Sequence, residues 1–98
     1  MRIYLKKFGN ILISRQSGKE AYAAFSPTLK TIQTDENVEV DFDGVITFSP
    51  SWGDEFLTPL IKQFGKRLRL FNIDKNPSII ESLKIIEQIS GFHFEARQ

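Results

Sequence analysis

The sequence predicts an α/β domain of two layers, in which helices cover mainly one face of a mixed β-sheet that opens with an N-terminal hairpin. Two observations predict this class. Segments with the alternating pattern of strands take turns along the chain with segments whose apolar residues recur at helical spacing. The strand segments also keep polar or charged residues at every second position, whereas parallel strands covered on both faces are apolar throughout. We therefore expect one open sheet face.

The composition is that of a small globular protein and narrows the function classes. The chain has 98 residues, of which 41% are hydrophobic and 26% are charged, so we expect a single domain over residues 1–98. A net charge of +1 supplies no broad positive field, so we expect no nucleic-acid partner. With no cysteine and one histidine, the chain offers no thiol nucleophile and no cluster of Cys and His ligands, so we expect no metal site and no cofactor. No segment resembles a signal peptide or a membrane span, which predicts a cytoplasmic protein without a membrane partner.

The N-terminal third predicts a hairpin followed by a helix. In residues 2–14, apolar residues alternate on either side of Gly9-Asn10, a dipeptide typical of tight turns, so we expect two antiparallel strands. Residues 14–32 then carry apolar residues at helical spacing. Pro27 interrupts this pattern because proline lacks the amide hydrogen that a helix needs, so we expect the helix to kink or restart there.

A single strand is predicted over residues 38–48. Its first half alternates between apolar and acidic residues, which is the pattern of a strand with one buried and one solvent-exposed face. We therefore place Glu39 and Asp41 on the exposed face. There they would lie near Arg67 or Arg69 of the next strand and form cross-strand ion pairs.

The second helix of the chain is predicted from the apolar stripe over residues 56–64. We expect it to begin near Ser51 and to end at Gly65, with Pro59 in its first two turns, where a missing amide donor costs least. A strand over residues 67–73 should follow it.

The last helix has the clearest boundaries. Asn76 is a favourable N-cap, Pro77 suits the first helical position, and Gly91 follows the last turn. Residues 92–96 alternate again and predict a closing strand. Because most strands are separated by helices, some of the strand pairing should be parallel.

Residues 38–64 carry two short motifs that resemble a known family. The strings "VDFDGV" and "SPSWGDEF" are similar to the strand and serine-bearing turn of STAS domains, which are found in anti-sigma-factor antagonists. The chain resembles more closely the STAS-like domain family of unknown function, whose pattern "DFxGV…S.SFADE" is matched from Asp41 to Glu55. The upstream string "FGNILISRQSG" also fits the opening of that family. The resemblance covers most of the chain and implies a STAS-like fold.

The resemblance implies a regulatory protein–protein interaction module and no enzyme. STAS domains dock through the turn between strand and helix onto a partner that is often a kinase-type anti-sigma factor, and phosphorylation of a serine in that turn blocks docking. The implied partner here is a histidine-kinase-like (GHKL) ATPase. The implied partner-binding turn, residues 49–55, contributes Ser49, Ser51, Trp52, Asp54 and Glu55.

The phosphoacceptor position differs from the STAS pattern. When the motifs are aligned without a gap, Pro50 occupies the place of the phosphorylated serine. A shift by one residue places Ser51 there, so Ser51 is the candidate phosphoacceptor. The residues themselves also support a structural role, because a Ser51 hydroxyl with Asp54 or Glu55 behind it resembles the start of a capped helix.

Trp52 has two possible roles. It lies outside the apolar stripe predicted for residues 56–64, which leaves open an exposed position as an interface anchor. The general tendency of large aromatic side chains to pack in the core favours burial. The sequence pattern favours the core without excluding the anchor.

Two other function classes remain as alternatives. A metal-dependent hydrolase would use Asp41, Asp43 and Asp54, although strict alternation places the first two on a solvent-exposed face. An RNA-binding sheet would use Phe92 and Phe94 as stacking residues, but the same spacing occurs in any strand that faces a core. The sole histidine has no neighbouring nucleophile in the sequence, so we expect it to be a solvent-exposed polar residue.

Overall fold

Strands and helices alternate along the chain, as the sequence predicts. The computed structural model describes residues 1–97, with side chains as far as residue 94. The α-helices are α1 (Arg15–Leu29), α2 (Pro50–Phe64) and α3 (Pro77–Ser90). The strands are β1 (Arg2–Tyr4), β2 (Ile11–Leu12), β3 (Val38–Asp41), β4 (Thr47–Phe48), β5 (Leu68–Phe71) and β6 (Glu95–Arg97). Short 3₁₀ helices are η1 (Leu5–Phe8), η2 (Gly65–Arg67) and η3 (Ile73–Lys75).

The strands form two small sheets in which every described pairing is parallel. One sheet has the order β1-β3-β5-β6, and the other consists of β2 and β4. The α/β class is therefore confirmed, whereas the N-terminal hairpin and the mixed sheet are wrong. Between β1 and β2, η1 buries Leu5 and the chain turns at Gly9, whose φ is 125°. This detour sends the two strands to different partners.

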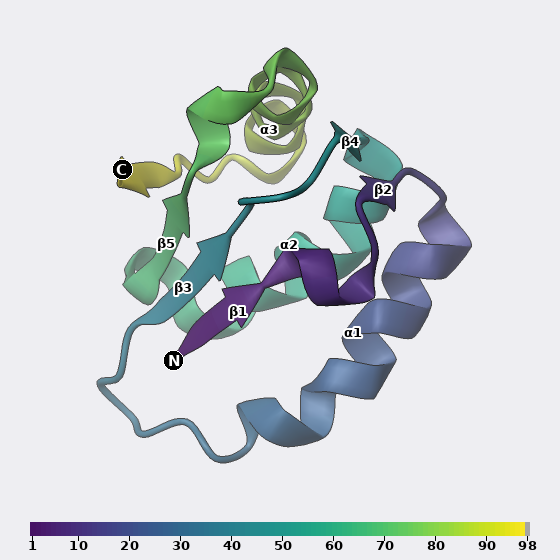
Figure 1. Ribbon diagram of the computed structural model, residues 1–98. Coiled ribbons are helices and arrows are strands. Elements are labelled where there is room, and N and C mark those ends of the chain that lie inside the picture. Colours follow the sequence, from purple (N-terminus) through teal and green to yellow (C-terminus); the bar gives the residue numbers. More distant parts are fainter. Residues whose placement is uncertain (98) are drawn as a thin grey trace.

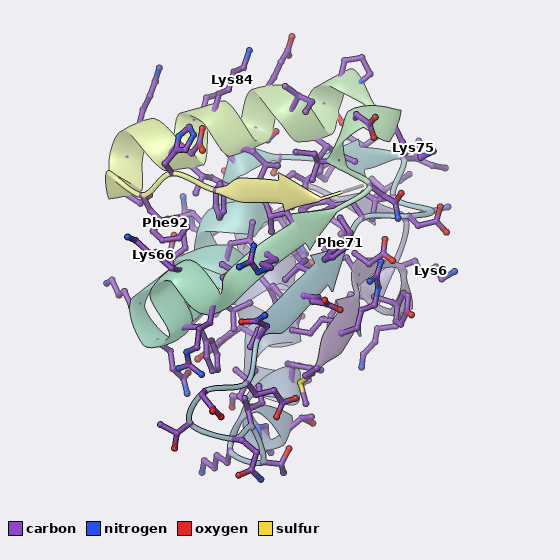
Figure 2. The ribbon with its side chains drawn as sticks, turned by 90° about the vertical axis from the view of Figure 1, so that its left-hand side faces the viewer. Lys6, Lys66, Phe71, Lys75, Lys84 and Phe92 are labelled. Carbon is purple, nitrogen blue, oxygen red and sulfur yellow. The ribbon has the colours of Figure 1, made fainter. Side chains whose placement is uncertain are left out.

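The helices lie on one side of the four-stranded sheet (Figure 1). Helix α2 packs between α1 and α3. The strand residues that face the helices are apolar and buried, namely Ile3, Val38, Val40, Leu68 and Leu70. Figure 2 looks onto the other face, where Phe71 is labelled and where the strands carry no covering helix. The predicted two-layer arrangement is confirmed.

The predicted strand over residues 38–48 is divided into β3 and β4. The chain turns at Asp43-Gly44, where Gly44 has a φ of 84° and the Val45 amide donates a hydrogen bond to the Phe42 carbonyl at 3.0 Å. A turn of this kind favours glycine because its left-handed backbone strains a side chain. The division lets β3 pair within the large sheet while β4 pairs with β2.

Helix boundaries follow the predicted caps only in part. In α3 the Asn76 side chain accepts a hydrogen bond from the Ser78 amide at 2.9 Å, and Gly91 has a φ of 74°, so both predicted ends are confirmed. Helix α1 runs through Pro27 and ends at Leu29. The predicted restart after this proline is wrong. The helix ends two residues after Pro27, so few helical hydrogen bonds remain for the proline to interrupt.

Helix α2 begins at Pro50, several residues before the predicted apolar stripe. Ser49 is its N-cap, and Pro50 occupies the first helical position, where proline loses no helical hydrogen bond. Pro59 therefore lies in the third turn and not in the first two. Gly65 ends the helix as expected, with a φ of 55°.

The outer edge of β4 is covered by polar side chains from the start of α3. Ser78 Oγ accepts a hydrogen bond from the Phe48 amide at 3.3 Å, and Ser82 Oγ donates one to the Phe48 carbonyl at 2.7 Å. The Asn76 side-chain amide donates to the Ile46 carbonyl. These side chains bind the backbone amide and carbonyl groups with which a further strand would pair.

Candidate functional site

The predicted partner-binding turn, residues 49–55, is the N-terminal end of α2. The Ser49 hydroxyl accepts a hydrogen bond from the Trp52 amide at 3.2 Å and donates one to the Ile13 carbonyl at 2.6 Å. Ser49 therefore caps the helix, and the capping role predicted for Ser51 is wrong. The half-buried Ser51 side chain makes no hydrogen bond with the described residues.

This difference between the two serines predicts unequal effects on stability. Ser49→Ala should lower the free energy of unfolding by about 1 kcal/mol, because the orphan amide of the first helical turn loses its acceptor. Ser51→Ala is the matched control and should change it by less than about 0.5 kcal/mol. Urea unfolding followed by circular dichroism measures both values. Equal losses for the two variants would contradict the assignment of the cap.

Trp52 is fully buried, so the core alternative is confirmed and its side chain does not form part of the surface of the turn. Its ring stacks on Phe56 with centroids 5.0 Å apart and packs against Phe48 at 6.0 Å. The indole N–H donates to Ser17 Oγ at 3.3 Å, which satisfies the one polar atom of the side chain. Trp52 therefore anchors the turn to α1 from the core side.

The two acidic residues of the turn lie at the surface and share one cation. The Arg15 guanidinium contacts Asp54 at 2.9 Å and Glu55 at 2.7 Å, and Thr58 donates a hydrogen bond to Asp54 at 2.8 Å. Hydrogen bonds from Arg15 and Thr58 lower the pKa of Asp54 and outweigh the opposing effect of burial. Arg15 thus holds the first turn of α1 against the start of α2.

A surface hollow of about 390 Å³ adjoins this ion pair. Its lining residues all belong to α2, namely Asp54, Glu55, Thr58, Pro59 and Lys62. Ser51 precedes Glu55 by one helical turn. The hollow therefore continues the exposed side of the turn along the helix.

Exposed isoleucines beside the turn were missed by the sequence analysis. Ile13 is 50% exposed, and its carbonyl is the group that binds the Ser49 hydroxyl. Ile11 and Ile46, on the segments that form the small sheet, are also more than half exposed. The sequence did contain a signal for this exposure. In a strand, residues 11 and 13 point to the face opposite that of residue 12, so burial of Leu12 leaves the two isoleucines on the outer face.

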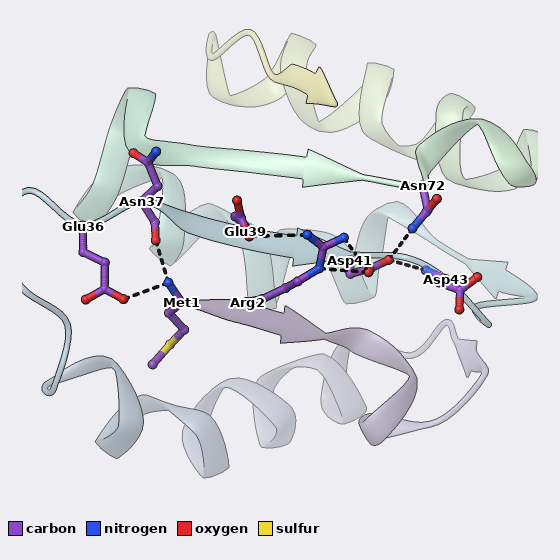
Figure 3. Close-up of polar contacts among 8 residues, drawn as sticks. All are labelled: Met1, Arg2, Glu36, Asn37, Glu39, Asp41, Asp43 and Asn72. Carbon is purple, nitrogen blue, oxygen red and sulfur yellow. Dashed lines mark hydrogen bonds and ion pairs between the residues drawn. The ribbon is translucent and has the colours of Figure 1, made fainter. Parts of the chain in front are cut away.

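A second polar cluster, also missed, lies on the open face of the sheet (Figure 3). Asp41 is buried and accepts hydrogen bonds from Arg2 Nη2 at 2.8 Å, from Asn72 Nδ2 at 2.8 Å and from the Asp43 amide at 2.9 Å. Arg2 also contacts Glu39 at 3.4 Å. This cluster ties β1, β3 and the end of β5 together.

The cluster corrects the predicted environment of Asp41. We expected a solvent-exposed carboxylate paired with Arg67 or Arg69, but its cation is Arg2, from the neighbouring strand on the other side. Arg67 instead donates to the carbonyl groups of Gln33 and Glu36. The Arg2 guanidinium also lies over the Phe71 ring, 4.2 Å from the centroid. This contact holds the guanidinium in the position in which it covers Asp41.

The cluster predicts that stability decreases in acid. Burial raises the pKa of Asp41, but hydrogen bonds from Asn72, the Asp43 amide and Arg2 outweigh it, so the pKa lies below its usual 3.8. The stabilisation is therefore complete above the usual pKa and is lost as pH falls through the lowered one. Asp41→Asn should cost about 2 kcal/mol at neutral pH and much less in acid. Urea unfolding of both proteins across this range tests it, and a constant difference would contradict it.

The residues of the two alternative functions do not form matching sites. No group of three His, Cys, Asp or Glu side chains within the described part of the chain is placed to hold a metal ion. Asp41 and Asp43 are neighbours, whereas Asp54 binds Arg15 and Thr58. For RNA, the Phe94 ring is 8% exposed and is not available for stacking on a base.

His93 is almost fully exposed, as predicted. It is 3.3 Å from Glu87, which also accepts a hydrogen bond from the Phe94 amide. No described helix is long and apolar enough to cross a membrane.

Comparison with known families agrees with the motifs of the central region. Residues 17–77, more than half of the chain, match the family model described as a STAS-like domain of unknown function. No match was found among curated proteins or solved structures. The matched region extends from α1 to the start of α3 and includes the whole 49–55 turn. The chain therefore belongs to the family of STAS-like domains of unknown function.

Proposed function

We propose that this domain is a regulatory protein–protein interaction module that docks through the 49–55 turn and the outer side of α2 onto a protein partner such as a histidine-kinase-like (GHKL) ATPase. The observation that carries the proposal is the surface at the start of α2: Asp54 and Glu55 line a hollow along the helix, and the half-exposed Ile13 binds the Ser49 cap of the same helix through its carbonyl. Membership of the STAS-like family supports it, because STAS domains dock through the equivalent turn.

The docking surface consists of Ile13, Arg15, Ser51, Asp54 and Glu55. An exposed apolar side chain next to charged groups has the composition of an interface centre with a polar rim. Trp52 supports this surface from within the core and does not touch the partner. The surface needs neither a catalytic residue nor a cofactor for this role.

Ser51 is the proposed phosphoacceptor of the docking surface. The hydroxyl of Ser49 is occupied by the Trp52 amide and the Ile13 carbonyl, whereas the hydroxyl of Ser51 has no hydrogen bond with the described residues. A phosphate on Ser51 would add negative charge near Asp54 and Glu55, whose two negative charges are only half offset by the single positive charge of Arg15. Phosphorylation would therefore change the charge of the surface and block docking.

Charge substitution within and outside the docking surface tests the proposal. Wild-type protein, Ser51→Asp and the matched control Thr34→Asp, in an exposed loop, are used as baits in the native extract. We expect one partner to be retained by wild type and Thr34→Asp and to be lost with Ser51→Asp, while circular dichroism shows all three baits folded. The purified partner should then bind in calorimetry with the same order of affinities. Equal retention by all three baits would contradict docking through this turn.

A further inference from the structure

We propose that Asp43-Gly44 is a site of spontaneous covalent modification in the folded protein, where Asp43 converts to isoaspartate. In this reaction the Gly44 backbone nitrogen attacks the side-chain carboxyl carbon of Asp43, and one water leaves to form a five-membered succinimide. One water then opens the ring. When this water cleaves the bond between the Gly44 nitrogen and the original main-chain carbonyl carbon of Asp43, the backbone continues through the side-chain carbonyl carbon. The product is an isomer of equal mass.

The electrophile of this reaction is accessible. The Asp43 side chain is 60% exposed, and the one cation near its carboxylate among the described residues is Lys6 at 3.8 Å, at the limit of an ion pair. Lys6 is itself 55% exposed, so this contact restrains the carboxylate weakly. The carboxylate of Asp41, by contrast, is held by four hydrogen bonds in the same region.

The nucleophile is also accessible. Gly44 is exposed, and its amide makes no hydrogen bond with the described residues. Glycine has no side chain to obstruct the approach of the carboxyl carbon. The positive φ of Gly44 and the hydrogen bond from the Val45 amide to the Phe42 carbonyl define a type II turn. A side chain at Gly44 would be strained there, and its Cβ would lie 3.2 Å from Lys6 Cδ.

The modification would change the connection that leads to the docking surface. Isomerisation inserts the Asp43 Cβ into the main chain and enlarges the turn that separates β3 from β4. The Asp43 amide also donates a hydrogen bond to Asp41, so the altered turn adjoins the cluster that joins the strands. We expect the aged protein to melt at a lower temperature than fresh protein.

Ageing of the folded protein tests the proposal. Protein is incubated for several weeks at body temperature and mildly acidic pH, and its peptides are separated by chromatography and assayed with an isoaspartate methyltransferase. Isoaspartate should accumulate several-fold faster at Asp43 than at Asp35, an exposed aspartate followed by glutamate. Asp43→Glu should abolish the product because its side chain would have to close a larger ring, and Lys6→Gln should accelerate it.

A urea-unfolded sample provides the reference for the intrinsic reactivity of the sequence. The proposal expects folded protein to react at a rate similar to that of the unfolded chain. Isoaspartate that forms in urea and stays absent from the folded protein would overturn it, because the turn would then protect the site. Equal accumulation at Asp35 and Asp43 in the folded protein would overturn it as well.

Discussion

Trp52→Ala should lower the free energy of unfolding by about 3–5 kcal/mol, which is a large part of the stability of a domain of this size. The fully buried indole packs against three aromatic rings, with the ring of Phe56 only 5.0 Å away. Its removal leaves a cavity at the point where α1 and α2 meet, and the hydroxyl of Ser17 loses its donor. Urea unfolding followed by circular dichroism is the measurement, because Trp52 is the sole tryptophan and tryptophan fluorescence is lost with it.

Trp52→Phe is the matched control for this substitution. It keeps an aromatic ring against Phe56 and loses the indole N–H together with part of the volume, so we expect a smaller loss than for alanine. A loss below about 1 kcal/mol for Trp52→Ala would contradict the core position, because removal of a buried aromatic side chain costs several times more.

Gly18→Ala should also destabilise the protein, although alanine is the better helix former. A Cβ at Gly18 would lie 2.6 Å from the Trp52 carbonyl oxygen and 3.0 Å from its Cα. Backbone atoms cannot rotate away as a flexible side chain can, so α1 and α2 must separate. The expected loss is about 1–3 kcal/mol, as for other overpacked cores.

The opposite substitution on the same helix separates packing from helix propensity. Ala23 is exposed on α1, so Ala23→Gly should cost about 1 kcal/mol through propensity alone. If the close approach of the helices controls stability, glycine is favoured at residue 18 and alanine at residue 23. Thermal and urea unfolding of both variants measure this. A gain in stability from Gly18→Ala would show that the helices adjust without cost.

The sequence predicts elements best where their signals are local. The Asn76-Pro77 start and Gly91 end of α3 depend on backbone groups within a few residues, and both are confirmed. The same signal was present at Ser49-Pro50 and was not used for α2. Starting the helix at Pro50 places Trp52 four residues before Phe56, on the buried stripe, so its burial could have been predicted.

Strand pairing was predicted less well because it depends on contacts between distant residues. β1 pairs with β3, more than thirty residues away, and nothing in the segment around Gly9 indicates that choice over a hairpin. The same distance separates Arg2 from Asp41. Alternation correctly placed Asp41 on the open face, but it could not show that an arginine from another strand covers this aspartate.

The candidate site shows the same limits. The motif located the 49–55 turn, and the acidic residues lie at the surface as a docking role requires. The contribution of Ile13 and Arg15 could not be read from the motif because both belong to an earlier segment, which reaches the turn through the pairing of β2 with β4. The chemical environment of the site therefore depends on the tertiary fold.

The polar side chains at the start of α3 affect how the protein behaves at high concentration. The outer backbone groups of β4, if they were free, would offer hydrogen bonds to a strand of another chain. Asn76, Ser78 and Ser82 occupy these groups from within the same chain. Helix α3 therefore acts as an intramolecular guard against association through this edge, and any loosening of its first turns would expose a surface prone to intermolecular β-sheet formation.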